Sequence, residues 1–118
     1  VNKLPALSEI TAKADERLIT MKNYIQTNYQ TVTLEDMATK LNLSVPYVSK
    51  YFKEKAQVTF GDYVRQVRMK KAKTLLKTTS MTIESIAESI GYANVEHFSR
   101  SFKKVYGMAP VQYRATGK

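Results

Sequence analysis

Residues 83–109, IESIAESIGYANVEHFSRSFKKVYGMA, hold the pattern that decides the fold. Four apolar residues in the first part of this stretch lie at helical spacing on one face: Ile83, Ile86, Ala87 and Ile90. Gly91 then supplies a residue that readily adopts positive φ, as the end of a helix often requires. A second helix is expected after the N-cap Asn94, with Phe98 and Phe102 four residues apart on its inner face. Two short helices joined by a tight turn predict a helix-turn-helix unit.

The charges are sorted between these two expected helices. Glu84 and Glu88 lie on the first helix, whereas Arg100, Lys103 and Lys104 lie on the second. Because cationic side chains are attracted to phosphate, the second helix is the one suited to a nucleic acid.

The same unit occurs earlier in the chain, which indicates an internal duplication. A shift of 49 positions aligns the two first helices and brings Leu41 onto Ile90. Asn42 falls on Gly91, and asparagine tolerates the left-handed conformation better than most residues with a side chain. After the turn the shift is 50 positions and aligns Val48, Ser49, Lys50, Phe52, Lys53 and Tyr63 with Phe98, Ser99, Arg100, Phe102, Lys103 and Tyr113.

The run IAESIGYANVEHFSRSFKKVYGMAPVQYR, residues 86–114, resembles the signature of the AraC/XylS family of bacterial transcription regulators. The resemblance covers roughly residues 34–114 and rests on Ile86, Ala87, Gly91, Tyr92, Phe98, Ser99, Phe102, Lys103, Gly107, Pro110, Tyr113 and Arg114. It implies an all-α fold of about seven helices, in which a long linker helix joins two homeodomain-like helix-turn-helix subdomains. Ala109 departs from the family, which usually has Ser or Thr there, and the missing capping hydroxyl is expected to cost about 1 kcal/mol.

The expected organisation divides the chain into four parts. Residues 1–11 are interpreted as a linker or lead-in, 12–58 as the first subdomain, 59–78 as the linker helix and 79–118 as the second subdomain. An amphipathic helix from about Thr11 to Tyr29 is expected to have a structural role. The last residues, 116–118, are interpreted as a frayed tail.

The linker helix is expected from Phe60 to Lys77. At about 1.5 Å per residue it spans roughly 27 Å, which approaches the 34 Å or so of one DNA turn. Four lysines on it are interpreted as a solvated face rather than as phosphate contacts: Lys70, Lys71, Lys73 and Lys77. Arg68 is expected to pair with a nearby acidic residue.

The outward faces of the two second helices supply the candidate DNA contacts, because the major groove accepts an α-helix. In the first unit they are Val45, Pro46, Tyr47, Ser49, Lys50 and Lys53, and in the second Asn94, Val95, Glu96, His97, Ser99, Arg100 and Lys103. Arg100 is the foremost candidate, because its planar fork can bind guanine O6 and N7 together. Glu96 either accepts from cytosine N4 or restrains Arg100. His97 is interpreted as a groove contact or a phosphate donor.

The charge of the chain favours a polyanionic partner. The net charge is +9 and the pI is near 9.8. The chain has no cysteine, which leaves no disulfide or thiolate metal site and fits a cytoplasmic location. No apolar run approaches the length of a membrane span, so no membrane partner is expected. Since the sequence starts at Val1 without Met, we expect a fragment that lacks an N-terminal sensing or dimerisation domain.

The leading hypothesis is a transcription activator that binds an asymmetric, bipartite site on double-stranded DNA and contacts RNA polymerase. One alternative is an architectural DNA-binding protein of low specificity, and another is a helical protein-interaction module with a basic face. An enzyme is disfavoured and no cofactor is expected, because no Gly-rich phosphate loop, metal cluster or catalytic carboxylate pair is present.

Overall fold

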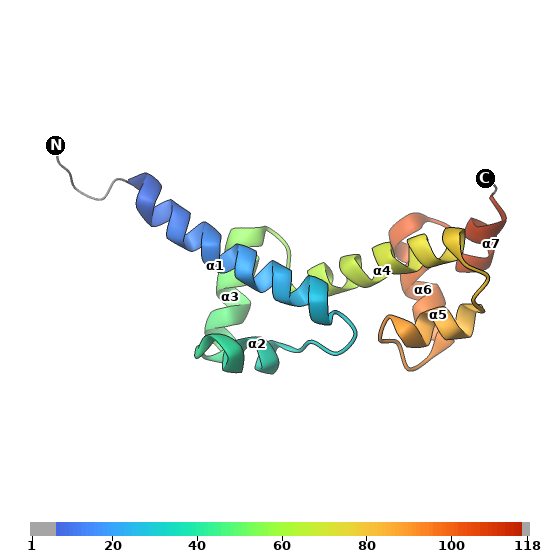
Figure 1. Ribbon diagram of the computed structural model, residues 1–118, viewed down its shortest axis with the longest axis horizontal. Helices are drawn as coiled ribbons and strands as arrows, with labels where there is room; N and C mark the ends of the chain where they lie inside the picture. The colour runs from blue at the N-terminus through green and yellow to red at the C-terminus, as the bar shows by residue number, and fades with distance from the viewer. Residues whose placement is uncertain (1–6, 117–118) are drawn as a thin grey trace.

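A computed structural model describes residues 7–116 of the chain. Within them the fold is all-α, as the sequence predicts. The seven helices are α1 (Leu7–Asn28), α2 (Leu34–Leu41), α3 (Val45–Ala56), α4 (Phe60–Thr78), α5 (Ile83–Ser89), α6 (Val95–Tyr106) and α7 (Pro110–Ala115). The molecule is elongated, and α4 connects α1–α3 at one end to α5–α7 at the other (Figure 1). In the described part of the chain, no helix is long and apolar enough to cross a membrane.

Two hydrophobic cores lie along α4, and this helix contributes to both. Its residues Phe60, Val64 and Val67 belong to the first core, and Met69, Ala72 and Leu76 belong to the second. The other buried residues of the first core are Met21, Ile25, Val32, Met37, Ala38, Val48, Tyr51 and Phe52. Those of the second core are Ile86, Ala87, Ile90, Phe98 and Phe102. Phe98 and Phe102, which the sequence places on the inner face of their helix, are fully buried, so they cannot stack on bases.

Side-chain caps set the start of the helices that carry the site. Thr33 and Asp36 form a capping box before α2, in which the side-chain oxygen of each residue accepts from the backbone N–H of the other at 3.0–3.1 Å. Ser44 Oγ accepts from the Tyr47 N–H and so caps α3. Asn94 Oδ1 accepts from the His97 N–H and caps α6 in the same way. Each cap satisfies a backbone donor that the first turn of the helix leaves unpaired.

The turns of the two units use the left-handed conformation, as expected. Asn42 has φ of 62° after α2, and Gly91 has φ of 105° in the turn between α5 and α6. The two units therefore turn with different residues at equivalent positions, since asparagine is among the few side-chain-bearing residues that tolerate this region.

The start of α1 differs from the sequence expectation. The helix begins at Leu7, before the expected Thr11, so residues 7–11 of the expected lead-in are helical. The rest of the expected lead-in, residues 1–6, and the end of the expected tail, residues 117–118, lie outside the described residues.

Candidate nucleic-acid interface

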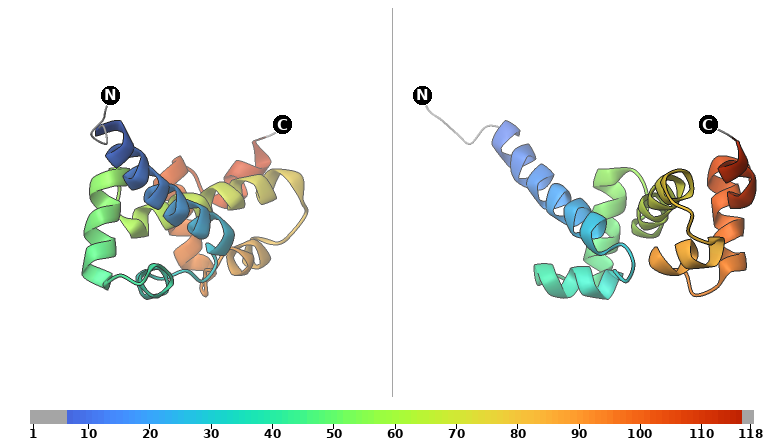
Figure 2. Two further views of the ribbon diagram at one scale, coloured as in Figure 1. Left: turned by 60° about the vertical axis from the view of Figure 1, so that its left-hand side comes forward. Right: turned by 45° about the vertical axis from the view of Figure 1, so that its right-hand side comes forward.

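The two helices that carry the candidate DNA contacts, α3 and α6, are presented in a similar way, and each is called the recognition helix of its unit. Both stand across the long axis, one on each side of the midpoint of α4 (Figure 2, right). Each follows a short helix, α2 or α5, and begins at a capped N-terminus. The duplication seen in the sequence is therefore a duplication of structure.

The outward face of α3 carries most of the residues that the sequence assigns to it. The exposed candidates are Pro46, Tyr47, Ser49, Lys50 and Lys53. Val45 is half-buried and packs against the first core, so it contributes less surface than expected. The face combines one aromatic ring with hydroxyl and ammonium donors.

An arginine from α1 holds the aromatic part of this face. Arg17 Nη1 donates to the Tyr47 hydroxyl at 3.1 Å, and the guanidinium also lies over the Tyr51 ring, 5.7 Å from its centroid. Tyr47 and Tyr51 stack on each other at 5.8 Å. The sequence expectation gave α1 only a structural role and missed this contact. No local pattern reveals it, because the partners are 30 residues apart in the chain.

The outward face of α6 is more highly charged. Its exposed candidates are Asn94, Glu96, His97, Arg100 and Lys103. Val95 and Ser99 are half-buried, and Val95 packs against the second core. The His97 ring meets the Tyr92 ring edge to face at 5.4 Å, so the turn before α6 supports the start of this helix.

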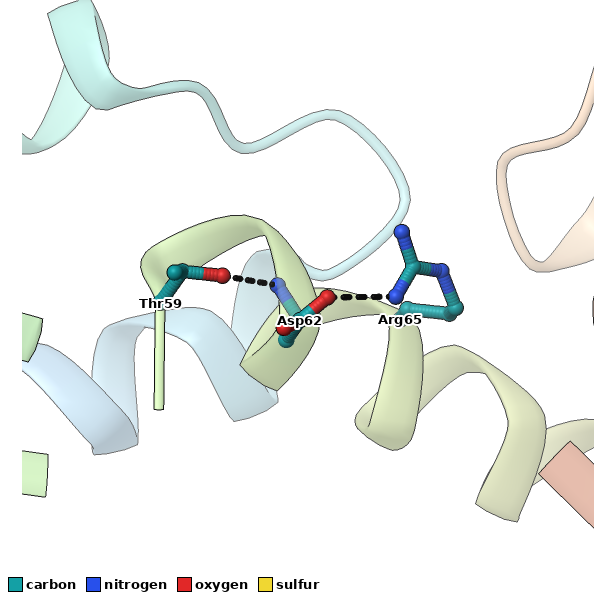
Figure 3. A network of polar contacts seen from close by, with 3 residues as sticks. All are labelled: Thr59, Asp62 and Arg65. Carbon is teal, nitrogen blue, oxygen red and sulfur yellow. Dashed lines mark hydrogen bonds and ion pairs between the residues drawn. The ribbon is translucent and has the colours of Figure 1, made fainter. Parts of the chain in front are cut away.

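Glu96 and Arg100 do not form an ion pair. Among the side chains that the structure describes, one ion pair forms, between Arg65 and Asp62 in the first turns of α4. Figure 3 shows this pair together with the cap from Thr59. The hydrogen bond that Arg65 donates to the Asp62 carboxylate lowers the pKa of Asp62, and a side-chain hydrogen bond with Thr59 acts in the same direction. Of the two roles expected for Glu96, restraint of Arg100 is therefore not seen.

The four lysines of α4 are exposed, in line with their interpretation as a solvated face, and three of them also contact aromatic rings. Lys71, Lys73 and Lys77 lie over the rings of Tyr29, Tyr106 and Tyr113, with ammonium-to-centroid distances of 5.7, 4.8 and 4.6 Å. Such cation–π contacts are worth about 0.5–1 kcal/mol each at exposed sites. These three contacts help to hold the tyrosine rings against α4.

The prediction that Arg68 pairs with an acidic residue was wrong. Its guanidinium donates to the backbone carbonyls of Tyr29 and Gln30, and burial lowers the pKa of Arg68. A carbonyl group satisfies a guanidinium donor without supplying a countercharge.

Comparison with known proteins agrees with this geometry. The model of a family described as "Helix-turn-helix domain" matches residues 37–116. The Msm operon regulatory protein of Streptococcus mutans is 31% identical over 94% of this chain, which spans 40% of that protein. The chain therefore covers less than half of this relative.

Two solved structures have the same fold. The C-terminal domain of AraT, a response regulator from Geobacillus stearothermophilus, matches with a TM-score of 0.82 and 37% identity, covering 86% of this chain and 85% of that one. The DNA-binding domain of AdpA, solved in complex with a target DNA, matches with a TM-score of 0.78 over 84% of this chain and 90% of its own. At 18% identity, the AdpA match concerns the fold alone.

Proposed function

The chain belongs to the AraC/XylS family of DNA-binding transcription regulators, and from this premise we propose that it recognises an asymmetric, two-part sequence on double-stranded DNA. Its recognition helices α3 and α6 enter successive major grooves on one face of the duplex. The two parts of the site differ in sequence, because the two helices present different side chains.

One observation carries this proposal: two capped helices with unlike polar faces stand at the two ends of a shared helix (Figure 2). The shared helix α4 has 19 residues, or roughly 28 Å at about 1.5 Å per residue. With its flanking turns it supports a separation close to one turn of DNA, about 34–36 Å. A binding surface for a protein partner would not require two similar helices at this separation.

The faces also divide into two kinds of contact. Arg100 and Lys50 occupy equivalent positions, and both are exposed where a base edge would lie. We assign them to guanine, Arg100 through two hydrogen bonds and Lys50 through one. Lys53 and Lys103 lie about one turn further along their helices, and we assign them to phosphates.

Selection of the 118-residue chain on randomised duplex DNA, at two salt concentrations, tests the proposal. Two unlike enriched motifs about one helical turn apart are expected. Enrichment of a single motif would show that one unit contacts bases and that the other contacts only the DNA backbone. Salt-sensitive binding without enrichment would favour the architectural alternative, since that binding depends on phosphates alone. If the chain did not bind DNA at all, the protein-interaction alternative would replace the proposal.

We further propose that the whole protein activates transcription in the bacterial cytoplasm through contact with RNA polymerase, the role that the family resemblance implies. Transcription in vitro from a promoter that carries the selected site tests this part separately. More transcript in the presence of the protein would support activation, and less transcript would show repression.

A further inference from the structure

The two units meet beneath α4, where the loop after α1 faces the turn between α5 and α6 (Figure 1). The Gln30 carbonyl oxygen lies 2.5 Å from the position that a Cβ on Gly91 would take. Real Cβ atoms do not approach an oxygen so closely, so only glycine permits this contact. Tyr29, in the same loop, packs against both hydrophobic cores. The loop of the first unit therefore touches the second unit directly.

Arg68 joins the two sides of this contact. From α4 its Nε donates to the Tyr29 carbonyl at 2.7 Å, and its Nη2 donates to the Gln30 carbonyl at 3.2 Å. The same guanidinium lies over the Tyr92 ring of the second unit, 5.6 Å from the centroid. One side chain thus binds the backbone of the first unit and an aromatic ring of the second.

Tyr92 extends the contact to the recognition helix. Its ring lies 5.4 Å from His97 and 5.7 Å from Phe98, and both residues belong to α6. Tyr92 and the start of α6 therefore belong to one packed group, so the contact of Arg68 with Tyr92 also places α6 relative to the first unit. The path from the first unit to the second recognition helix consists of direct contacts.

The second unit contains an arginine that serves as a comparison. Arg114 Nε donates to the Leu76 carbonyl at 3.1 Å, and its Nη2 donates to the Thr79 carbonyl at 3.2 Å. It ties α7 to the end of α4, much as Arg68 ties α4 to the loop after α1. Binding to carbonyls at the end of an earlier helix is therefore common to both units. The stack of Arg68 on Tyr92 is an addition that crosses between them.

We propose that the junction of Gln30, Arg68, Gly91 and Tyr92 fixes the angle between the recognition helices, and that Arg68 is thereby a positioning residue that sets the spacing between the two DNA motifs. This inference rests on the proposed function. One added base pair moves the second motif by roughly 3.4 Å and turns it by roughly a tenth of a helical turn. A rigid junction cannot follow that movement, so a misplaced motif loses the high effective concentration that the first contact provides.

Binding to spacing variants of the selected site tests the proposal. For the unaltered chain, one base pair added or removed between the motifs is expected to weaken binding at least about tenfold. Arg68→Lys keeps the charge but removes the two-carbonyl bond and the planar stack. For this variant we expect weaker binding at the selected spacing and a penalty for altered spacing that shrinks to about threefold or less.

Two controls separate positioning from folding. Arg65→Lys is the same substitution one turn earlier on α4, at a residue whose ion pair with Asp62 lies within that helix. It should keep the full spacing penalty. A duplex with a single motif should bind Arg68→Lys as tightly as the unaltered chain, because each unit keeps its own recognition helix. A folding defect would weaken single-motif binding as well.

A measurement without DNA keeps the inference separate from the proposed function. The chain has no cysteine, so Thr39→Cys in α2 and Val111→Cys in α7 place spin labels at two exposed positions, one in each unit. Pulsed dipolar spectroscopy should give a narrow distribution of label distances that becomes broader in Arg68→Lys and stays narrow in Arg65→Lys. If this occurs in a chain that selects no two-part site, the junction is rigid and the proposed function fails.

Two results would overturn the inference. The first is a label distribution that Arg68→Lys leaves unchanged. The second is a spacing profile of Arg68→Lys that coincides with that of the unaltered chain on a two-part site. Either would show that the contacts of Arg68 do not determine how the two units are placed.

Discussion

The two helix-turn-helix units share a backbone plan but support their recognition helices differently. In the first unit, Arg17 reaches from α1 to hold Tyr47 on the face of α3. In the second unit, Tyr92 in the turn before α6 supports His97, and Tyr92 itself carries the guanidinium of Arg68. The two units thus each have a hydrophobic core and caps before their first and second helices, whereas the supports of their outer faces differ.

The outer faces also differ in how they can recognise a base. Lys50 presents a mobile point charge, whereas Arg100 at the equivalent position presents a planar fork with fixed donors. An aromatic hydroxyl at Tyr47 has its counterpart in an imidazole at His97 after the shift of 50 positions. A difference in sequence between the two DNA motifs is therefore expected from the side chains alone.

Removal of one core aromatic gives the largest expected effect and tests whether the units are independent. Phe52→Ala and Phe102→Ala, at equivalent and fully buried positions, should each lower the free energy of unfolding by about 3–5 kcal/mol. Because α4 belongs to both cores, each variant should still unfold in one transition. Urea denaturation followed by circular dichroism measures both quantities. Two separate transitions would mean that the units are stable without each other.

The second largest effect is expected from loss of the side chains assigned to guanine, one on each recognition helix. Arg100→Ala should remove about 1–3 kcal/mol of discrimination at one base pair, because a two-bond contact with guanine is lost. Lys50→Ala should remove less, since a lysine makes no planar two-bond contact. Competition binding with single-base variants of the selected site measures both losses. Lys104→Ala, which removes the same charge from an exposed position of α6, should leave base preference unchanged.

Substitutions at the helix caps should change the free energy of unfolding by a smaller amount. Removing the cap in the first unit should lower it, and adding one in the second unit should raise it. Thr59 Oγ1 accepts from the Asp62 N–H at 3.0 Å, whereas the equivalent Ala109 makes no side-chain cap. Gln112 Oε1 accepts from the Ala109 N–H at 3.2 Å, so half of a capping box is already present before α7.

Ala109→Thr should therefore raise the free energy of unfolding by about 1 kcal/mol, and Thr59→Ala should lower it by a similar amount. Thermal and urea unfolding of the two variants and the unaltered chain provide the measurement. An unchanged free energy of unfolding in Ala109→Thr would show that a threonine hydroxyl adds nothing to the stability that the Gln112 bond already gives the start of α7.

The smallest expected effect concerns the phosphate contacts. Lys53→Ala and Lys103→Ala should weaken binding to every sequence similarly and reduce the slope of log affinity against log salt by about one. Titrations at several salt concentrations, with the selected site and a scrambled duplex, measure the slope. A change in base preference for either variant would place that lysine at a base and not at a phosphate.

Local features of the fold were predictable from the sequence. The caps at Thr33, Ser44 and Asn94 act over three residues, and the turn at Asn42 depends on the conformational range of one residue. Apolar spacing then identified which side of each helix is buried. These signals depend on residues close together in the chain, so they can be read without knowledge of the rest of the structure.

Contacts between distant segments were not predictable. Arg68 binds backbone carbonyls 38 and 39 residues away, and a carbonyl group has no side-chain signature in a sequence. The contact of Arg17 with Tyr47 depends on the packing angle of α1, which no single helix encodes. The early start of α1 at Leu7 was missed because Pro5 suggested a linker there. The residues that link the two units therefore had to come from the structure.

The shared helix α4 also affects how this protein can evolve. Phe60, Val64 and Val67 are needed by one unit, and Met69, Ala72 and Leu76 are needed by the other. A descendant that deleted either unit would leave half of this apolar stripe in water, and such a shortened chain would aggregate. Selection for a well-folded product therefore retains both units, even in a lineage where one recognition helix has stopped reading its bases. Once the duplication shared a helix, the loss of one copy was no longer a neutral change.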